Sequence, residues 1–259
     1  MSDESDEKEK FSGRANDYTK YRSRYSMQLI AVMEAKCGLR KEHVIADIGA
    51  GTGMLAELFL AHGNRVIAVE PNAEMMAECM KMQAQYPALQ TVMASAEETT
   101  LAAGCVDFVA AGRAFHWFDA ERARVEFKRI LKAHGWVILA SVGRRRGDTP
   151  LEREYEDLLL RTTPAYAETT SRFKVYDEPE IFFGNGSCVL RETIESTEAM
   201  TLAMLEGQTR SLSCAPLDGD PGYEAMRAGL TELFRRHAQN GVLQMPVISH
   251  LICGQFAAD

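Results

Sequence analysis

The sequence predicts a doubly wound α/β domain, in which helices cover both faces of a mostly parallel sheet. Apolar runs and amphipathic segments alternate five times between residues 43 and 142, which is the order expected of parallel strands joined by helical crossovers. A turn with three alternate glycines follows the first apolar run at residues 49–53. The last run, residues 136–142, is almost continuously apolar, as a strand covered on both faces should be.

Composition and charge narrow the class of partner. Of the 259 residues, 46% are apolar and 25% are charged, and the formal net charge is −8. These values are typical of a soluble globular chain, and the excess of acid disfavours a general nucleic-acid binder, which needs clustered Lys and Arg. The chain has no apolar run of membrane-spanning length and no N-terminal apolar segment. We therefore expect a cytoplasmic protein that acts on a small molecule and contacts neither nucleic acid nor membrane.

Cysteine spacing gives no indication of a metal centre or a redox dithiol. The six cysteines are scattered, and no two of them are separated by two residues. They are Cys37, Cys79, Cys105, Cys188, Cys214 and Cys253. We predict no metal site and expect most of these thiols to be reduced and buried.

The N-terminal part leads into the first strand. Residues 1–10 are charged residues and serines with a single apolar residue, so we expect a disordered tail. Residues 11–25 mix aromatic and basic side chains, and we interpret them either as a lid over a bound ligand or as a surface helix packed on the core. A predicted helix over residues 26–37 then precedes a strand over residues 43–48.

The glycine turn and the acid that follows it form the most informative stretch. The turn reads Gly49-Ala50-Gly51-Thr52-Gly53, and its glycines let the backbone turn sharply and pass close to a ligand. A helix over residues 52–62 and a strand over residues 65–69 lead to Glu70, which lies 17 residues beyond Gly53. A carboxylate at this position can accept hydrogen bonds from the two hydroxyls of a ribose. The unit therefore predicts an adenosine-type ligand.

The spacing also limits which adenosine ligand fits. A dinucleotide fingerprint needs a third glycine where this chain has Met54, and no phosphate-binding Gly-Lys-Ser/Thr follows the turn. No Lys or Arg lies between Gly49 and Asn64 to meet a pyrophosphate. We therefore expect a ligand other than an anionic nucleotide. Asp47 would repel a phosphate, and it either holds an amino group or organises the turn around a cation.

Two segments resemble a known family. Asp47-Ile-Gly-Ala-Gly-Thr-Gly53, followed by Val69-Glu-Pro-Asn72, is similar to the first two motifs of the class I S-adenosylmethionine-dependent methyltransferases. The resemblance is strong over about residues 40–142. It implies a Rossmann-like seven-stranded sheet whose last strand is antiparallel, with S-adenosylmethionine as the cofactor. The alternative is a doubly wound domain without a nucleotide, in which the glycine turn is accidental.

The next elements add candidate contacts to the adenine. A predicted helix follows the acid, and its Met75 either packs on the adenine face or belongs to the core. A strand over residues 89–94 then leads to Ser95-Ala96-Glu97, at the same sheet edge as the glycine turn. In the resembling family the position of Ser95 is often an acid that binds the adenine amino group, and a hydroxyl accepts that hydrogen bond more weakly. We expect the backbone of Ala96 to supply the other ring contact.

A fourth strand over residues 106–111 leads into a second informative stretch, Gly112 to Asp119. His116 lies there among aromatic side chains. It either acts as a general base, since the unperturbed pKa of histidine is near neutrality, or fastens the loop. His116-Trp117-Phe118 resembles one group of small-molecule methyltransferases, including trans-aconitate-type enzymes, in which the segment borders the cofactor. The resemblance implies a location beside the cofactor and leaves the role of His116 open.

The C-terminal half is predicted to cover the acceptor. Arg144, Arg145 and Arg146 follow the fifth strand, and they form either a solvated surface or a site for a carboxylate. The remaining predicted elements are a helix from Asp119 to Gly135, a helix over 149–161, a turn-rich segment over 163–186, a strand over 187–195, helices over 198–210 and 221–239, and a last strand over 246–256. We assign residues 11–142 to a lid and cofactor-binding core. Residues 143–259 form a helical insertion and the last strands of the same domain.

These observations converge on a site and an activity. The residues assigned to the cofactor are Asp47, Gly49, Ala50, Gly51, Glu70, Pro71, Met75, Ser95, Ala96, Glu97, Arg113 and Phe115. The residues assigned to the acceptor are Tyr18, Tyr21, Arg22, His116, Trp117 and Arg144. His116 is the candidate catalytic residue.

The predicted function is S-adenosylmethionine-dependent methyl transfer to a small-molecule acceptor, at an oxygen or a carboxylate. One alternative is a non-catalytic S-adenosylmethionine-binding regulator. Another is an RNA methyltransferase, which the acidity of the chain and the lack of an Asn/Asp-Pro-Pro-aromatic stretch disfavour.

Overall fold

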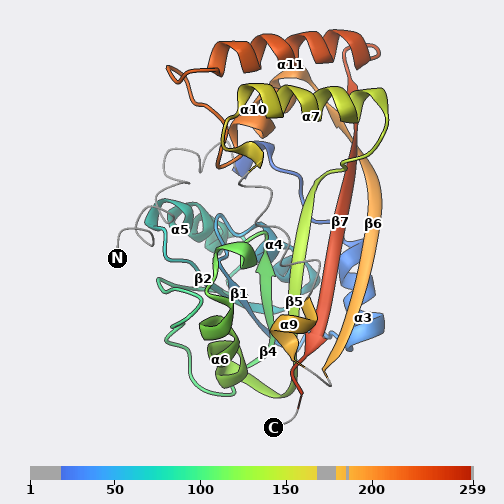
Figure 1. Cartoon of the computed structure of the whole chain (residues 1–259). Helices are drawn as coiled ribbons and strands as arrows, with labels where there is room; N and C mark the ends of the chain where they lie inside the picture. The colour runs from blue at the N-terminus through green and yellow to red at the C-terminus, as the bar shows by residue number, and fades with distance from the viewer. Residues whose placement is uncertain (1–18, 168–178, 185–186, 258–259) are drawn as a thin grey trace.

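The computed structural model describes residues 19–167, 179–184 and 187–257 of the chain. They form one seven-stranded sheet in the order β3-β2-β1-β4-β5-β7-β6 (Figure 1). The strands are β1 (Val44–Ile48), β2 (Arg65–Val69), β3 (Leu89–Val92), β4 (Val106–Gly112), β5 (Leu131–Arg144), β6 (Cys188–Met200) and β7 (Leu243–Gln255). Strands β1 to β5 pair in parallel, whereas β7 runs antiparallel to both β5 and β6. The predicted doubly wound, Rossmann-like sheet with an antiparallel last strand is therefore confirmed.

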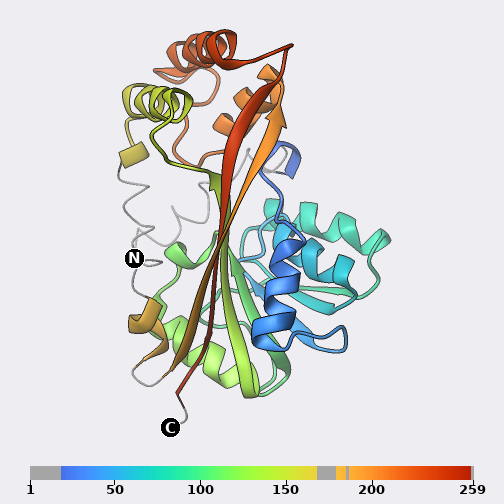
Figure 2. The same ribbon diagram turned by 90° about the vertical axis from the view of Figure 1, so that its right-hand side faces the viewer.

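Helices cover both faces of the sheet, and a cluster of buried side chains fills each interface. On one face the buried side chains belong to α3 (Gln28–Cys37), α4 (Met54–His62) and α5 (Ala73–Met80). On the other face they belong to α6 (Ala120–Ile130) and α9 (Pro179–Phe183). Figure 2 shows these two groups of helices on opposite sides of the sheet.

The inner strands are buried on both faces, which explains their continuous apolar sequences. In β4, Phe108 and Ala110 belong to the cluster beneath α3 to α5, whereas Val109 and Ala111 belong to the cluster beneath α6. This alternation is the two-residue period of a strand. A strand of this kind has no solvent-facing side and therefore carries few polar residues.

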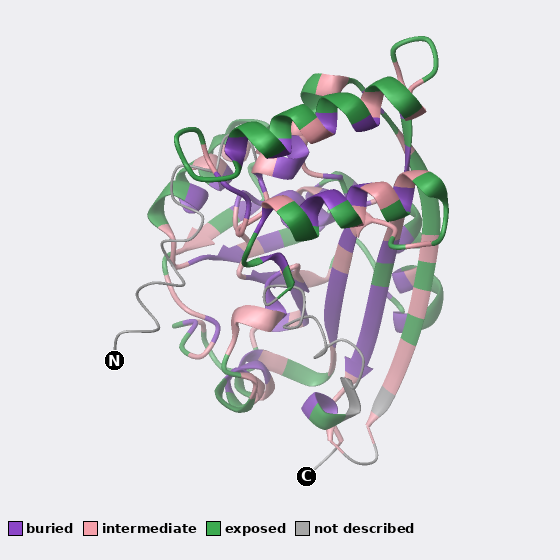
Figure 3. Cartoon of the chain, turned by 45° about the horizontal axis from the view of Figure 1, so that its top comes forward, coloured by how far each residue is buried: buried purple, intermediate pink, exposed green. Residues whose placement is uncertain are grey.

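The C-terminal half forms a cap at one end of the sheet. Strands β5, β6 and β7 are 14, 13 and 13 residues long and extend beyond the parallel core. They carry α7 (Pro150–Thr162), α10 (Leu202–Arg210) and α11 (Tyr223–His237) at their far end (Figures 1 and 2). Figure 3 shows the exposed faces of α7 and α11 turned away from the strands. The buried faces of these helices join the same cluster as α3 and α4, so the cap and the core share one interior.

Pairing along the long strands corrects three predicted boundaries. The predicted helix over residues 198–210 is wrong at its start, because residues 198–200 still pair with β7. The helix α10 begins after Thr201, whose side chain accepts a hydrogen bond from the Met204 backbone N–H. The predicted helix that ends at Gly135 stops at Ile130, since the next residue already pairs with β4. Strand β7 likewise begins at residue 243, three residues earlier than predicted. Contacts with a distant strand override the local pattern in each case.

The described residues can also be searched for membrane spans, metal-binding groups and disulfides. Within residues 19–167, 179–184 and 187–257, we find no helix that has both the length and the apolar character needed to cross a membrane. The same ranges contain no group of three or more His, Cys, Asp or Glu side chains arranged to hold a metal ion. Cys37, Cys79, Cys105, Cys214 and Cys253 are free thiols, and Cys37, Cys79 and Cys253 are buried. The predicted tail and residues 11–18 of the predicted lid lie outside the described residues.

Candidate active site

A cavity of about 810 Å³ lies at the carboxyl ends of β1, β2 and β4. Its wall is formed by the glycine turn, the acid that follows β2, the loop after β3 and the segment after β4. The residues that the sequence assigns to the cofactor and that line this cavity are Gly49, Ala50, Gly51, Glu70, Pro71, Met75, Ser95, Ala96, Glu97 and Arg113. Asp47 and Phe115, which have the same assignment, do not line it.

The glycine turn is shaped by positive backbone angles. The φ angles of Gly49, Gly51 and Gly53 are 65°, 57° and 85°, in the left-handed region that favours glycine. A Cβ atom on Gly49 would lie 2.6 Å from Ala114 Cβ, and one on Gly53 would lie 2.2 Å from Met82 Cε. A Cβ atom on Gly51 would meet nothing within 4 Å. Packing against Ala114 therefore requires glycine at position 49, the left-handed backbone favours glycine at position 53, where the Met82 side chain could move aside, and Gly51 opens space for a ligand.

Glu70 holds the turn as well as facing the cavity. Its Oε2 accepts a hydrogen bond from the Gly51 backbone N–H at 2.9 Å, and its Oε1 accepts one from the Asn72 N–H at 2.8 Å. Burial raises the pKa of Glu70, and these two hydrogen bonds offset part of that rise. Each carboxylate oxygen has a further lone pair, so the side chain can still accept from two hydroxyls. The sequence predicted the ligand contact and missed the support that Glu70 gives to the turn.

Asp47 lies beneath the turn, fully buried. Neither of its carboxylate oxygens makes a hydrogen bond of good geometry with a described residue. Burial raises the pKa of Asp47 to about 8, the backbone N–H of Ala56 lowers it in part, and the charge of Glu70 raises it further. An uncompensated buried carboxyl costs free energy in the folded state, and a positive charge bound nearby would reduce that cost.

Phe115 also lies away from the cavity, in the interior beneath α6. Its ring centroid is 4.6 Å from that of Phe182 and 5.9 Å from that of Phe118, both in edge-to-face geometry. Phe115 is the buried residue of the short 3₁₀ helix Phe115–Trp117 and does not line the cavity, so its assignment to the cofactor stays a prediction. His116 and Trp117, the next two residues, do reach the cavity.

The loop after β3 is fastened to α6. The Thr99 backbone N–H donates to Glu126 Oε1 at 2.8 Å, and the Thr99 hydroxyl donates to the same atom. Hydrogen bonds from Arg129, followed by those from Thr99, lower the pKa of Glu126 to about 2 despite its burial. The Asp119 N–H also donates to Glu97 Oε1 at 3.0 Å. These bonds hold the predicted adenine-binding loop in place before any ligand arrives.

Arg113 lies at the centre of the site with an unusual backbone. Its φ angle is 55°, in the left-handed region, which costs free energy for a residue other than glycine. Its guanidinium donates to the Val142 carbonyl at 3.2 Å and to Met54 Sδ at 2.9 Å. The guanidinium carbon also lies 5.3 Å from the centre of the Tyr25 ring. Arg113 thus joins the segment after β4 to β5, α4 and the N-terminal part.

A second cavity, of about 680 Å³, adjoins the first. Arg113, His116 and Trp117 line both cavities, so these three residues form the junction between them. The second cavity extends over the faces of β5, β7 and β6 and under α7 and α10. Arg22 and Arg144, two further residues assigned to the acceptor, lie in its wall.

The arginine run that ends β5 and follows it is paired with acids of α7 and β6. Arg144 donates to Glu156 and to the Tyr166 hydroxyl, and its guanidinium lies 4.9 Å from the centre of the Tyr155 ring. Arg145 pairs with Glu152 at 2.7 Å and with Glu195 at 2.8 Å. Arg144 and Arg145 therefore line the second cavity but are already paired with acids of the chain. Neither a solvated surface nor a free carboxylate site, the two alternatives from the sequence, describes them.

The remaining predicted acceptor residues lie elsewhere. Tyr21 packs against α10, where a Cβ atom on Gly207 would lie 2.2 Å from its ring, and it lines neither cavity. Tyr18 lies outside the described residues. Sequence reasoning missed several cavity residues, namely Tyr25 in the first and Ser141, Arg191, Thr193 and His250 in the second. The alternation in β6 signals that Arg191 and Thr193 share a face, but it does not indicate which one.

The fold and the site define a class. A seven-stranded sheet with antiparallel β7, a glycine turn after β1 and an acid after β2 is the arrangement of class I methyltransferase domains, which use S-adenosylmethionine. Residues 46–139 match the family model described as "Methyltransferase domain". The described residues therefore have the fold of class I methyltransferases, and residues 46–139 are similar to a methyltransferase domain.

Individual proteins agree with this assignment. A Dictyostelium discoideum protein named as a methyltransferase is 27% identical over 135 residues, which are 52% of this chain and 49% of that protein. The malonyl-[acyl-carrier protein] O-methyltransferase of Pectobacterium atrosepticum is 31% identical over 116 residues, or 44% of this chain and 43% of that enzyme. The chain spans about half the length of the curated relatives it matches. A structure from Anaeromyxobacter dehalogenans, solved as a candidate type II methyltransferase, has a TM-score of 0.68 at 20% identity and covers 91% of this chain and 98% of its own.

Proposed function

We propose that the protein transfers the methyl group of S-adenosylmethionine to an oxygen of a small anionic acceptor, with a carboxylate as the favoured group. The observation that carries the proposal is the shared wall of the two cavities, formed by Arg113, His116 and Trp117. The first cavity offers a glycine turn and an acid to an adenosine. The second is lined by arginines, which suit an anion. Cofactor and acceptor would meet at the junction.

The residues of the first cavity fit S-adenosylmethionine. The open space at Gly51 lets the backbone approach the ligand, and Glu70 keeps a lone pair on each oxygen for the ribose hydroxyls. Asp47 is a buried carboxyl beside the turn whose ionised form a positively charged ligand would stabilise. The cofactor, when bound, supplies a methyl group on a sulfonium, which is a good leaving group.

The protein then has to bind, orient and shield the acceptor. Holding the acceptor oxygen in line with the methyl group supplies most of the rate enhancement expected of such an enzyme, and excluding water prevents side reactions. A carboxylate needs no base, whereas a hydroxyl acceptor must lose a proton. His116 lies at the junction, where it can take that proton from a hydroxyl or donate a hydrogen bond to a carboxylate.

The proposal is tested in two steps. Calorimetric titration with S-adenosylhomocysteine measures cofactor binding, and transfer of a labelled methyl group to a panel of small carboxylic acids and alcohols measures turnover. We expect turnover with a carboxylic acid and only a modest fall in kcat for His116→Ala. A loss of about 10²–10⁴-fold in His116→Ala, confined to an alcohol substrate, would instead identify a hydroxyl acceptor and a catalytic base.

The alternative functions give other outcomes. A non-catalytic regulator would bind S-adenosylhomocysteine and methylate nothing in the panel, and the second cavity beside the cofactor site favours an enzyme over that reading. An RNA methyltransferase would label RNA, against which the net charge of −8 argues. The name of the Pectobacterium relative, an O-methyltransferase, supports an oxygen acceptor. The likeness of His116-Trp117-Phe118 to the trans-aconitate-type group supports a small carboxylic acid, and a cytoplasmic location stays a prediction.

A further inference from the structure

A half-buried acid, Glu198, lies near the end of β6, the strand that leads into α10 of the cap (Figure 1). By the two-residue period of a strand it shares a face with Ile194 and Met200, which pack in the same cluster as α3 and α4. Glu198 lines neither cavity. A carboxylate among apolar side chains costs free energy unless hydrogen bonds or an opposite charge compensate it. The contacts of Glu198 therefore show what holds an acid at this place.

The Glu198 carboxylate is fixed by hydrogen bonds that begin in the cap. Gln208 Nε2 of α10 donates to Ser23 Oγ at 3.0 Å, and Ser23 Oγ donates to Glu198 Oε2 at 2.9 Å. Both Ser23 and Gln208 are buried. A serine hydroxyl has one proton, and this one is used on the carboxylate. The chain of bonds joins the N-terminal part, β6 and α10, and it gives the carboxylate a defined position.

The charge that acts on Glu198 belongs to Arg113. Burial raises the pKa of Glu198, and the Ser23 hydroxyl and the positive charge of Arg113 lower it in part. Arg113 lines both cavities, and a guanidinium keeps its proton in proteins. Glu198 therefore offsets part of the positive charge at the junction from a position outside both cavity walls.

Charge at the junction affects the cofactor directly. In the proposed function the methyl group passes from the first cavity to the second, so the sulfonium has to lie beside the junction residues. A sulfonium is permanently positive, and two like charges in a partly desolvated site repel each other. The product S-adenosylhomocysteine carries a neutral thioether at the same place. An uncompensated Arg113 would thus weaken the binding of S-adenosylmethionine and leave that of the product nearly unchanged.

We propose that Glu198 is a positioning residue, which neutralises Arg113 at the junction and so raises the affinity for S-adenosylmethionine relative to S-adenosylhomocysteine. This inference rests on the proposed function, because it takes the junction as the place of methyl transfer. Glu70 does not discriminate in this way, since its carboxylate faces the ribose, which the two molecules share. A site that disfavours the product is inhibited less as methylation proceeds.

The test is calorimetric titration of the full chain with S-adenosylmethionine, S-adenosylhomocysteine and sinefungin, in which a protonated amine replaces the methylated sulfonium. Glu198→Gln keeps the size of the side chain and removes its charge. We expect it to lower the affinity for the two positively charged ligands by about 5- to 50-fold and that for S-adenosylhomocysteine by less than about twofold. Glu198→Asp keeps the charge and should retain most of the preference.

Ser23→Ala is a second variant, which decides the matter if Glu198→Gln fails to fold. It removes the hydrogen bond that fixes the carboxylate and leaves the charge in place. The ratio of the affinities for S-adenosylmethionine and S-adenosylhomocysteine should change in the same direction by a smaller factor. An unchanged ratio in the variants that fold, or an equal loss for all the ligands in Glu198→Gln, would overturn the inference.

The matched control is Glu195→Gln, on the opposite face of the same strand. Glu195 also lies beside an arginine, with its Oε2 2.8 Å from Arg145 Nη1, and it lines neither cavity. Its variant should leave the ratio of affinities unchanged. Failure of the proposed function looks different, because the wild-type protein would then bind none of the ligands, or would bind them and methylate no acceptor.

Discussion

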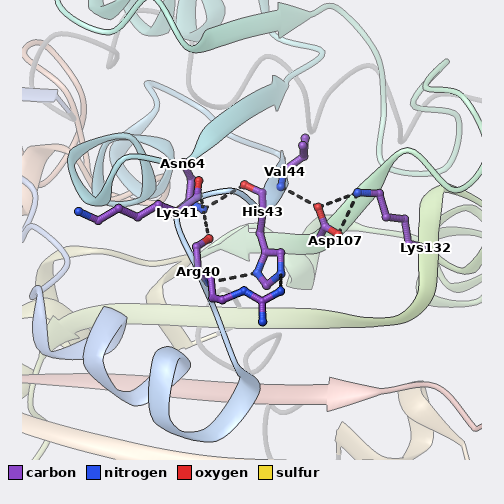
Figure 4. A network of polar contacts seen from close by, with 7 residues as sticks. All are labelled: Arg40, Lys41, His43, Val44, Asn64, Asp107 and Lys132. Carbon is purple, nitrogen blue, oxygen red and sulfur yellow. Dashed lines mark hydrogen bonds and ion pairs between the residues drawn. The ribbon is translucent and has the colours of Figure 1, made fainter.

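Polar groups differ in their hydrogen bonding between the two ends of the parallel strands. At the carboxyl ends, Asp47 is buried without a good hydrogen bond, and Arg113 holds a left-handed backbone. At the amino ends, polar groups are matched (Figure 4). The Asn64 amide donates to the carbonyls of Arg40 at 2.8 Å and His43 at 3.0 Å.

Asp107 completes the network at the amino ends. Its carboxylate accepts from the Val44 backbone N–H at 2.8 Å and from Lys132 Nζ at 2.9 Å (Figure 4). The same strands thus end in a satisfied network on one side and in an uncompensated carboxyl on the other. Ligands bind outside the carboxyl ends of parallel strands. We expect substitutions at the two ends to separate ligand binding from stability.

The largest effect is expected at Gly51. Gly51→Val places a side chain in the space left for the ligand, so S-adenosylhomocysteine binding should fall by more than about 100-fold in calorimetric titration, a loss of roughly 3 kcal/mol or more. The left-handed backbone should cost about 1–2 kcal/mol of unfolding free energy. Gly241→Val is the matched control, since Gly241 has a φ of 75° and its Cβ would also meet nothing within 4 Å. It should show the stability loss alone, and unimpaired binding in Gly51→Val would make the turn purely structural.

At the amino ends the loss should fall on stability. Asn64 is fully buried, and Asn64→Ala leaves the backbone carbonyls of the loop before β1 without their donor. We expect the free energy of unfolding in urea to fall by about 2–4 kcal/mol, from lost hydrogen bonds and stranded buried acceptors. The affinity for S-adenosylhomocysteine, measured where both proteins are fully folded, should not change. A large loss of affinity in Asn64→Ala would contradict the separation between the two ends.

Glu70 combines both roles and sharpens the comparison. Glu70→Gln keeps the size of the side chain but replaces a charged acceptor, so we expect S-adenosylhomocysteine affinity to fall by about 1–3 kcal/mol. One of the backbone N–H groups of Gly51 and Asn72 also loses its acceptor, and stability should fall by a smaller amount. The matched control is Glu57→Gln, at a partly exposed carboxylate of α4 that lines neither cavity. Equal affinities in both variants would mean that Glu70 serves only the turn.

The next prediction concerns how the free energy of unfolding changes with each unit of pH. Because the pKa of Asp47 is raised to about 8 in the folded protein, the folded state keeps a proton that the unfolded state has lost above about pH 4. Stability of the ligand-free protein should therefore decrease as pH rises through this window, by at most about 1.4 kcal/mol per pH unit, and level off above pH 8. Asp47→Asn should remove most of this slope in urea titrations at several pH values, and the raised pKa of Glu70 should leave a smaller slope of the same sign.

Asp107 should give the opposite sign. Burial acts to raise its pKa, but the bonds from Val44 and Lys132 outweigh burial and lower it. Its stabilisation is therefore present above its ordinary pKa and is lost as pH falls through the lowered one. Asp107→Asn should weaken the loss of stability in acid and leave the slope near neutral pH unchanged. If both variants changed the same pH range, the contrast between the two aspartates would be wrong.

How far the sequence predicts the molecule depends on how local each feature is. The unit from β1 to Glu70 is contiguous, and its glycines, its apolar runs and the position of its acid follow from the spacing alone. The alternation of strands and helices likewise predicts a doubly wound sheet, because each crossover involves neighbouring segments. The boundaries of β6 and α10 were missed, since residues 198–200 become strand only through pairing with β7.

By itself, the sequence determined the ligand end of the site, where a turn, a helix and an acid follow one another in the chain. The tertiary structure alone decided the acceptor end. A strand's two-residue period shows that Arg191 and Thr193 share a face, but the register with β7 selects the cavity side. The arginines after β5 gained their partners from α7 and β6, which lie far from them in sequence. Local spacing constrains backbone turns, whereas the neighbours of a long side chain depend on which distant segments the fold brings beside it.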